Sequence, residues 1–324
     1  MADSRDESPR TSLPLSPADE EMIRAVRRLI AEDRIMEAME AVERMSTRPQ
    51  LRWIGRRLIA ASRQATRLGF APGDQARTAV ATVLADIHRQ DRSVPTGDGG
   101  PLVIEKPGAE QVVVVFSGNE QAPFAHVVLQ SYLRRRPCHA IYVADPRRLF
   151  GVGGLPGLGG DLAATARNLR ILCDRLGARQ RFCFGFSGNG YAAMRHALEI
   201  DAEAVLAFSP PTKLNLRRRQ VETQPMIRRL HEILPHMAQD LRPLYRARHR
   251  LPATTIVYGA ASQGDTRYAR RMEELPNLRL VPIPGYAEHD SLSVAIVSGR
   301  LSGLIDRMLA GRAIDNPDRV DGAP

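Results

Sequence analysis

The sequence predicts an α/β fold, with a mainly parallel central sheet, helices on both faces and an all-helical N-terminal extension. From residue 102 onward, apolar runs alternate with helix-like stretches, which is typical of parallel strands joined by helices. The run Val112–Phe116 is apolar at every position, as a strand covered on both faces requires. Before residue 92, apolar residues recur only at helical spacing. Together these observations predict one α/β domain and a helical appendage.

The N-terminal extension is predicted to hold four helices. Ser16-Pro17-Ala18-Asp19 is typical of a helix start, with a serine cap, a proline at the first helical position and an early acid. Trp53 lies in the third helix, and the fourth covers about 75–90. These helices carry apolar stripes that need a surface to pack on. We expect that surface to be a partner protein, a second copy of the chain, or the α/β domain itself.

Composition divides the chain into segments. We expect a disordered tail, a helical extension, a linker rich in glycine and proline, the α/β domain and a flexible tail, at 1–15, 16–91, 92–101, 102–311 and 312–324 respectively. Strands are predicted at 102–105, 111–117, 139–144, 181–186, 204–208, 254–258 and 278–283. Helices are predicted between them at about 124–135, 161–176, 189–199, 265–274 and 290–310. Residues 211–250 are predicted to form a polar helical cap.

Charge and composition limit the classes of function. The net charge is +10, but nearly all basic residues are arginine and no aromatic-interleaved basic strand accompanies them, so nucleic-acid binding is not indicated. No apolar stretch is long enough to span a bilayer, and the first residues do not resemble a secretory signal. Cys138, Cys173 and Cys183 are expected to be reduced thiols. We expect a cytoplasmic protein.

One segment has the pattern of a nucleophilic serine. Gly185-Phe186-Ser187-Gly188-Asn189-Gly190 follows an apolar run and leads into a helical pattern. A tight turn between strand and helix can project a serine hydroxyl out of a sheet, and glycines allow the strand and the helix to come close. In the common pattern Gly-x-Ser-x-Gly, the second glycine stands where this chain has Asn189.

From about residue 102 to 311 the chain resembles the α/β-hydrolase superfamily. Residues 185–190 resemble the nucleophile elbow of that family. The family order is serine, acid, histidine. The resemblance makes Ser187 the nucleophile, Asp265 the acid and His289 the base, each just past a strand. It implies that backbone amides near Gly118 and Asn119, with that of Gly188, bind the oxyanion.

Each role has a simpler alternative. Ser187 could lie in an ordinary turn, His289 could be a surface histidine, and Asp265 could only cap a helix. The glycine-rich run 151–160 lacks the lysine of a phosphate loop and is predicted to be a loop before helix 161–176. The remaining histidines lack ligand-like spacing, so no metal site is expected. Chemistry by a serine, a histidine and an acid needs no cofactor, so none is expected.

The cap carries an excess of seven positive charges, including Arg217, Arg218 and Arg219, which could favour an anionic or carrier-bound acyl substrate. A solvated surface is the alternative. The sequence therefore predicts a serine hydrolase that cleaves an ester or thioester through an acyl-enzyme. An acyltransferase with the same triad and a non-catalytic binding or scaffold protein are the alternatives.

Overall fold

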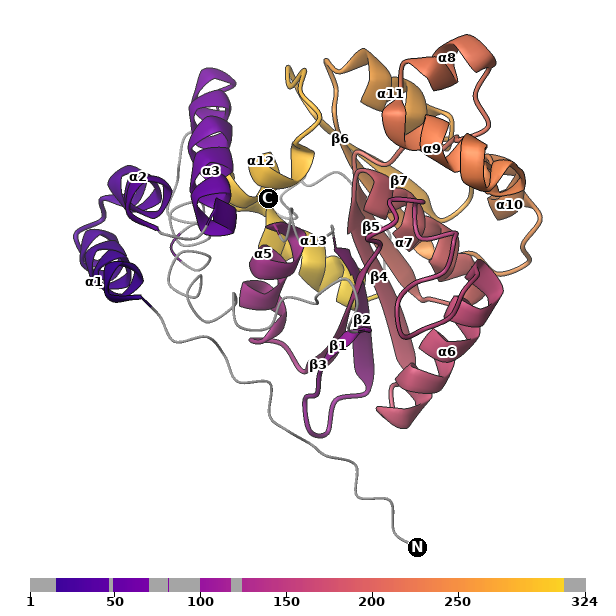
Figure 1. The fold of residues 1–324 in the computed structure, drawn as a ribbon, viewed down its shortest axis with the longest axis horizontal. Coiled ribbons are helices and arrows are strands. Elements are labelled where there is room, and N and C mark those ends of the chain that lie inside the picture. The colour runs from indigo at the N-terminus through magenta and orange to yellow at the C-terminus, as the bar shows by residue number, and fades with distance from the viewer. Residues whose placement is uncertain (1–15, 47–48, 70–80, 82–99, 118–123, 312–324) are drawn as a thin grey trace, which may run out of the picture.

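The computed structural model describes residues 16–46, 49–69, 81, 100–117 and 124–311 of the 324-residue chain. Its centre is a seven-stranded sheet with the strand order β1-β3-β2-β4-β5-β6-β7 (Figure 1). The strands are β1 Leu102–Ile104, β2 Gln111–Ser117, β3 Cys138–Ala144, β4 Gln180–Phe186, β5 Ala204–Phe208, β6 Ala253–Gly259 and β7 Leu278–Ile283. Only β1 is antiparallel to its neighbour, and the other pairings are parallel. The predicted fold class is confirmed.

Helices cover both faces of this sheet. One face carries α5 Phe124–Leu133, α12 Ser291–Val297 and α13 Arg300–Leu309, and the other carries α6 Leu162–Arg175, α7 Gly188–Glu199 and α11 Gln263–Arg270. Side chains of β2 alternate between the two cores, with Val113 and Val115 on the first face and Val112 and Val114 on the second. Burial on both faces explains why this strand is apolar at every position.

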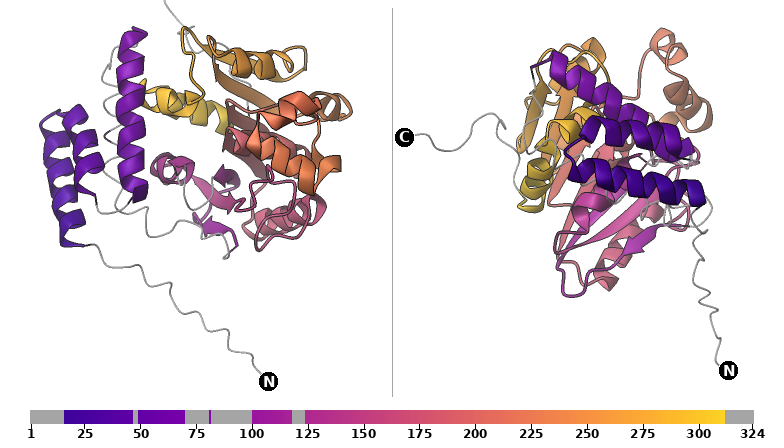
Figure 2. Two further views of the ribbon diagram at one scale, coloured as in Figure 1. Left: turned by 45° about the horizontal axis from the view of Figure 1, so that its top comes forward. Right: turned by 90° about the vertical axis from the view of Figure 1, so that its left-hand side faces the viewer.

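The N-terminal helices α1 Pro17–Ala31, α2 Ile35–Met45 and α3 Pro49–Arg67 pack beside the sheet domain (Figure 2). As predicted, Ser16 caps α1, accepting a hydrogen bond from the Asp19 amide at 3.1 Å. Helix α3 packs against α12, and apolar side chains of α1–α3 belong to the same buried cluster as those of α12 and α13. The α/β domain thus covers at least part of their apolar stripes. Both predicted tails lie outside the described residues, as do the predicted fourth helix except residue 81 and the predicted linker except residues 100–101.

Two predicted helices have different limits in the structure. The single helix expected at 290–310 is two helices, because Gly299 has a left-handed φ of 75° between α12 and α13. The helix expected at 265–274 spans Gln263–Arg270, because Ser262 caps it. The cap consists of α8 Arg218–Glu222, α9 Pro225–Ile233, the short 3₁₀ helix η2 Pro235–Met237 and α10 Leu241–Arg246.

Hydrogen bonds hold the glycine-rich loop against the sheet and α7. Asp145 accepts from the amides of Leu149 and Gly151 at 2.6 and 2.8 Å. His196 of α7 donates its Nε2–H to the Gly151 carbonyl at 3.0 Å. No helix in the described part of the chain has both the length and the apolar character to cross a bilayer.

His196 gives the folded state a specific pH dependence. The ring is fully buried and stacks on Phe116, and this burial lowers its pKa from 6.5 to about 4. Between these values the unfolded chain binds more protons than the folded one, so stability falls as the pH is lowered. We expect a loss of roughly 3 kcal/mol from this residue between about pH 7 and pH 4. Urea unfolding at both pH values should show a smaller loss in the free energy of unfolding for His196→Gln than for wild type. An equal loss would contradict the assignment of this pH dependence to His196.

Candidate active site

Ser187 lies in the sharp turn between β4 and α7. Its backbone has φ 56° and ψ −129°, a conformation that residues with a side chain rarely adopt. Hydrogen bonds hold this turn, since the Ser187 amide donates to the Phe208 carbonyl at 2.8 Å and its own carbonyl accepts from the Gly190 amide at 2.8 Å. The local geometry is therefore that of a nucleophile elbow.

The structure explains why the elbow can have asparagine at position 189, where the common pattern has glycine. A Cβ on Gly185 would lie 2.1 Å from the backbone oxygen of Asn189, so β4 and the first turn of α7 meet there without room for a side chain. A Cβ on Gly190 would lie 3.1 Å from Pro210, which is a milder constraint. Asn189 lies within α7, does not have a positive φ and is half-buried. Its own position therefore does not require glycine.

Ser187, His289 and Asp265 form one continuous hydrogen-bonded chain. His289 Nε2 lies 2.7 Å from Ser187 Oγ, and His289 Nδ1 lies 2.9 Å from Asp265 Oδ1. Their elements follow β4, β6 and β7, so all three side chains come from the carboxyl edge of the sheet. The Asp265 side chain is buried, whereas that of His289 is half exposed. The structure thus brings together the three residues selected from the sequence.

Asp265 is not the cap of a helix. Ser262 has that position in α11, with its Oγ accepting from the Asp265 amide at 3.4 Å. The Asp265 carboxylate points instead to His289, and its Oδ2 is buried with no hydrogen-bond partner among the described residues. The imidazole is therefore the only hydrogen-bond donor to this carboxylate in the described part of the chain.

The loop that carries His289 is tied to the sheet. Ser291 Oγ lies 2.8 Å from Ser209 Oγ and donates to the Val257 carbonyl at 3.3 Å. On the other side, Asp290 pairs with Arg57 of α3. The sequence analysis missed these supports, because no local pattern relates residue 57 to residue 290 or residue 209 to residue 291.

The backbone amides proposed for the oxyanion are only partly within the described residues. Gly188 is buried at the first position of α7, where helix amides have no acceptor within the helix. Gly118 and Asn119 lie outside the described residues. Ser117 directly precedes these two residues, and the four residues 116–119 have the same sequence as 186–189. Ser117 is buried and donates its hydroxyl to the Val143 carbonyl at 2.9 Å.

The start of helix α9, in the cap, lies beside the elbow. A Cβ on Gly188 would lie 3.2 Å from both Met226 Cε and Phe150 Cε1, so these two side chains border the start of α7. The three arginines at 217–219 are at the exposed start of α8, and Arg218 pairs with Glu222. In the described structure none of these arginines is bonded to Ser187, Asp265 or His289.

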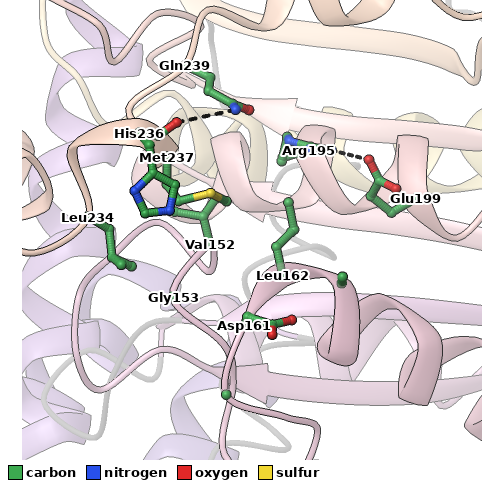
Figure 3. Close-up of a pocket in the computed structure, with 12 residues that line it drawn as sticks. Val152, Gly153, Asp161, Leu162, Arg195, Glu199, Leu234, His236, Met237 and Gln239 are labelled. Atoms are coloured by element: carbon green, nitrogen blue, oxygen red, sulfur yellow. Dashed lines mark hydrogen bonds and ion pairs between the residues drawn. The ribbon is translucent and has the colours of Figure 1, made fainter.

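A separate cavity of about 350 Å³ lies at the far end of α9 (Figure 3). Leu162, Leu234 and Met237 contribute apolar wall, while the paired Arg195 and Glu199 lie at one side. No residue of the Ser187–His289–Asp265 chain lines it. Within the described residues, no group of three His, Cys, Asp or Glu side chains is placed to hold a metal ion.

The sheet order, the antiparallel β1, the elbow and the order serine, acid, histidine along the carboxyl edge define an α/β-hydrolase fold. This is the fold that the resemblance in the sequence implied.

No family model matches the chain, and no curated protein matches it. Solved structures that it resembles include an S-formylglutathione hydrolase from Agrobacterium tumefaciens, at 15% identity and TM-score 0.44 over 66% of this chain and 92% of that one. Est1E from Butyrivibrio proteoclasticus has 13% identity and TM-score 0.43 over 65% of this chain and 94% of its own. The capsule O-acetyltransferase of Neisseria meningitidis serogroup A has 13% identity and TM-score 0.46 over 64% of this chain and 91% of its own. These similarities concern the fold alone.

Proposed function

We propose that the protein is a serine hydrolase that cleaves an ester or thioester through an acyl-enzyme intermediate. The single observation that carries this proposal is the hydrogen-bonded chain from Ser187 Oγ through His289 to Asp265, with distances of 2.7 and 2.9 Å. A serine hydroxyl is a poor nucleophile until a neighbouring base accepts its proton. We propose His289, whose Nε2 lies 2.7 Å from Ser187 Oγ, as that base.

In the acylation step, Ser187 Oγ attacks the carbonyl carbon while His289 Nε2 takes the hydroxyl proton. Asp265 accepts the Nδ1–H of His289, which selects the tautomer with a free Nε2 and stabilises the imidazolium that forms. His289 then returns the proton to the leaving alcohol or thiol, and the acyl group stays on Ser187. In deacylation, water loses a proton to His289 and attacks the acyl-enzyme, releasing the acid.

The tetrahedral intermediate needs donors for its oxyanion. The Gly188 amide directly follows the nucleophile, and we propose it as one donor, with the amides of Gly118 or Asn119 as the second. The reaction needs no cofactor. The three cysteines are free and buried, which suits the proposed cytoplasmic location.

Labelling with a fluorophosphonate probe tests the proposal, because the probe reacts only with an activated serine. We expect wild type to be labelled, Ser187→Ala to be unlabelled, and labelled peptide mapping to return Ser187. Ser117→Ala is the matched control, since that hydroxyl is held by the Val143 carbonyl, and it should label like wild type.

Two results would contradict the proposal. Folded wild-type protein that is not labelled would favour the non-catalytic alternative, and equal labelling of Ser187→Ala would assign another nucleophile. Product analysis with and without an added alcohol or amine then separates hydrolysis from acyl transfer, because only a transferase forms the new ester or amide as its main product.

A further inference from the structure

An arginine of the N-terminal extension reaches the loop that carries His289. Arg57 of α3 donates Nε–H to Asp290 Oδ2 at 2.8 Å and pairs through Nη2 with Asp290 Oδ1. This bidentate geometry is the strongest that an arginine and a carboxylate form. Both side chains are mostly shielded from solvent, at 15% and 28% exposure, so the pair is screened less than a surface pair. Asp290 directly follows His289 in the chain.

The same guanidinium also approaches the residue before the nucleophile. Its central carbon lies 5.3 Å from the centre of the Phe186 ring, within range of a cation–π contact. The Phe186 ring lies 5.6 Å from the His289 ring. Arg57 therefore contacts the neighbour of Ser187 on one side and the neighbour of His289 on the other.

Helix α3 and the residue that follows it contact several parts of the 285–290 loop. Trp53, one turn before Arg57, lies under the guanidinium at 4.6 Å, and Leu68 lies 2.9 Å from the position of a Cβ on Gly285. Figures 1 and 2 show α3 beside α12, the helix that begins directly after Asp290. The contacts thus extend from one end of the 285–290 loop to the other.

We propose that Arg57 is a positioning residue for the base. Through Asp290 and Phe186 it fixes the distance between His289 and Ser187, so that the N-terminal extension contributes to the chemistry of the α/β domain. This inference rests on the proposed function. Misplacing a reacting group by about 1 Å can lower a rate by roughly a hundredfold, so the loop needs support from both sides.

The Asp290 carboxylate that pairs with Arg57 also caps α12. It accepts from the Ser293 amide at 3.1 Å and from the Ser293 hydroxyl at 2.6 Å, and Ser291 is anchored to Ser209 and Val257. The donors of these bonds lie in α12 itself and not in α3. Removal of Arg57 therefore leaves α12 capped and releases the side of the loop that bears His289.

The test is a double-mutant cycle on the full-length protein, read as the rate of fluorophosphonate labelling at Ser187 and as kcat and KM for p-nitrophenyl acetate. Arg57→Met removes the pair from one side. Asp290→Asn removes it from the other, and asparagine remains a good helix cap. Arg56→Met is the matched control, because Arg56 is on the same helix and its exposed side chain pairs with Glu43. Circular dichroism and thermal unfolding check that each variant is folded.

We expect Arg57→Met to slow labelling at least about tenfold and to lower kcat with little change in KM. The double variant should be no slower than the slower single variant, because both changes break one pair. Arg57→Lys, which keeps the charge without the bidentate fork, should recover part of the rate, and Arg56→Met should match wild type.

A wild-type labelling rate in folded Arg57→Met would overturn this inference and leave the proposed function standing. Additive losses in the double variant, or equal losses for Arg56→Met, would also overturn it, since they would indicate a general effect of α3. Should Arg57→Met not fold, Arg57→Lys and Asp290→Asn carry the same comparison. Wild type without any labelling would overturn both proposals together.

Discussion

Replacing His289 with alanine is expected to lower kcat roughly 10⁶-fold on p-nitrophenyl acetate, because the Ser187 hydroxyl then has no base within hydrogen-bond distance. Fluorophosphonate labelling should be lost to a similar degree. The free energy of unfolding should fall by about 1–3 kcal/mol, because among the described residues the buried Asp265 carboxylate then has no hydrogen-bond donor. Stopped-flow and steady-state assays with the purified variant measure the effect.

His249→Ala is the control for this variant. His249 is exposed in the segment before β6, so its removal should leave kcat and labelling at the wild-type level. A kcat for His289→Ala within tenfold of wild type would contradict the assignment of His289 as the base. An equal loss in His249→Ala would instead indicate damage unrelated to the site.

The second large effect is expected at Gly185. In Gly185→Ala the new methyl group meets backbone atoms of Asn189 and Gly190, none of which can rotate away as a side chain could. We expect a loss of about 3 kcal/mol or more in the free energy of unfolding, at the upper end for overpacked positions. We also expect loss of labelling, because the first turn of α7 must move and Ser187 directly precedes it. Urea unfolding and probe labelling measure the two consequences.

Gly303→Ala provides the contrast. Gly303 lies on the exposed side of α13 with nothing near its Cβ position, so alanine there should raise stability by roughly 0.5–1 kcal/mol through its better helix propensity. Unchanged stability in Gly185→Ala, with labelling retained, would show that the elbow can relax and would refute the close approach as the reason for this glycine.

The sheet and the elbow could be predicted because their signals are local. A strand such as β2 is apolar at every position, and Gly185, Ser187 and Gly190 stand together between a strand and a helix. The candidate acid and base came from the resemblance to the α/β-hydrolase superfamily, and their places after predicted strands agreed with it. The break at Gly299 was missed although Ser298-Gly299 interrupts the helical pattern, because the apolar spacing continues on both sides of it.

Other features have no local signal. Ser262, and not Asp265, caps α11. Which residue caps this helix depends on where the chain leaves β6, and tertiary contacts determine that point. The pairing of Arg57 with Asp290 depends on how α3 docks, and many arginines of this chain could have paired with that carboxylate. Hydrophobic periodicity showed that α3 has an apolar side, but not which helix covers it.

That docking also determines the order in which the chain can fold. Arg57 and Asp290 are 233 positions apart, and α12, on which α3 packs, comes later still. During synthesis from the N-terminus, α3 emerges first, yet its binding surface is completed only when nearly the whole α/β domain has been made. A contact of this separation forms late, because the intervening chain must first be ordered. Helix α3 is therefore made well before α12, and we expect it to reach its native position only after α12 has been made.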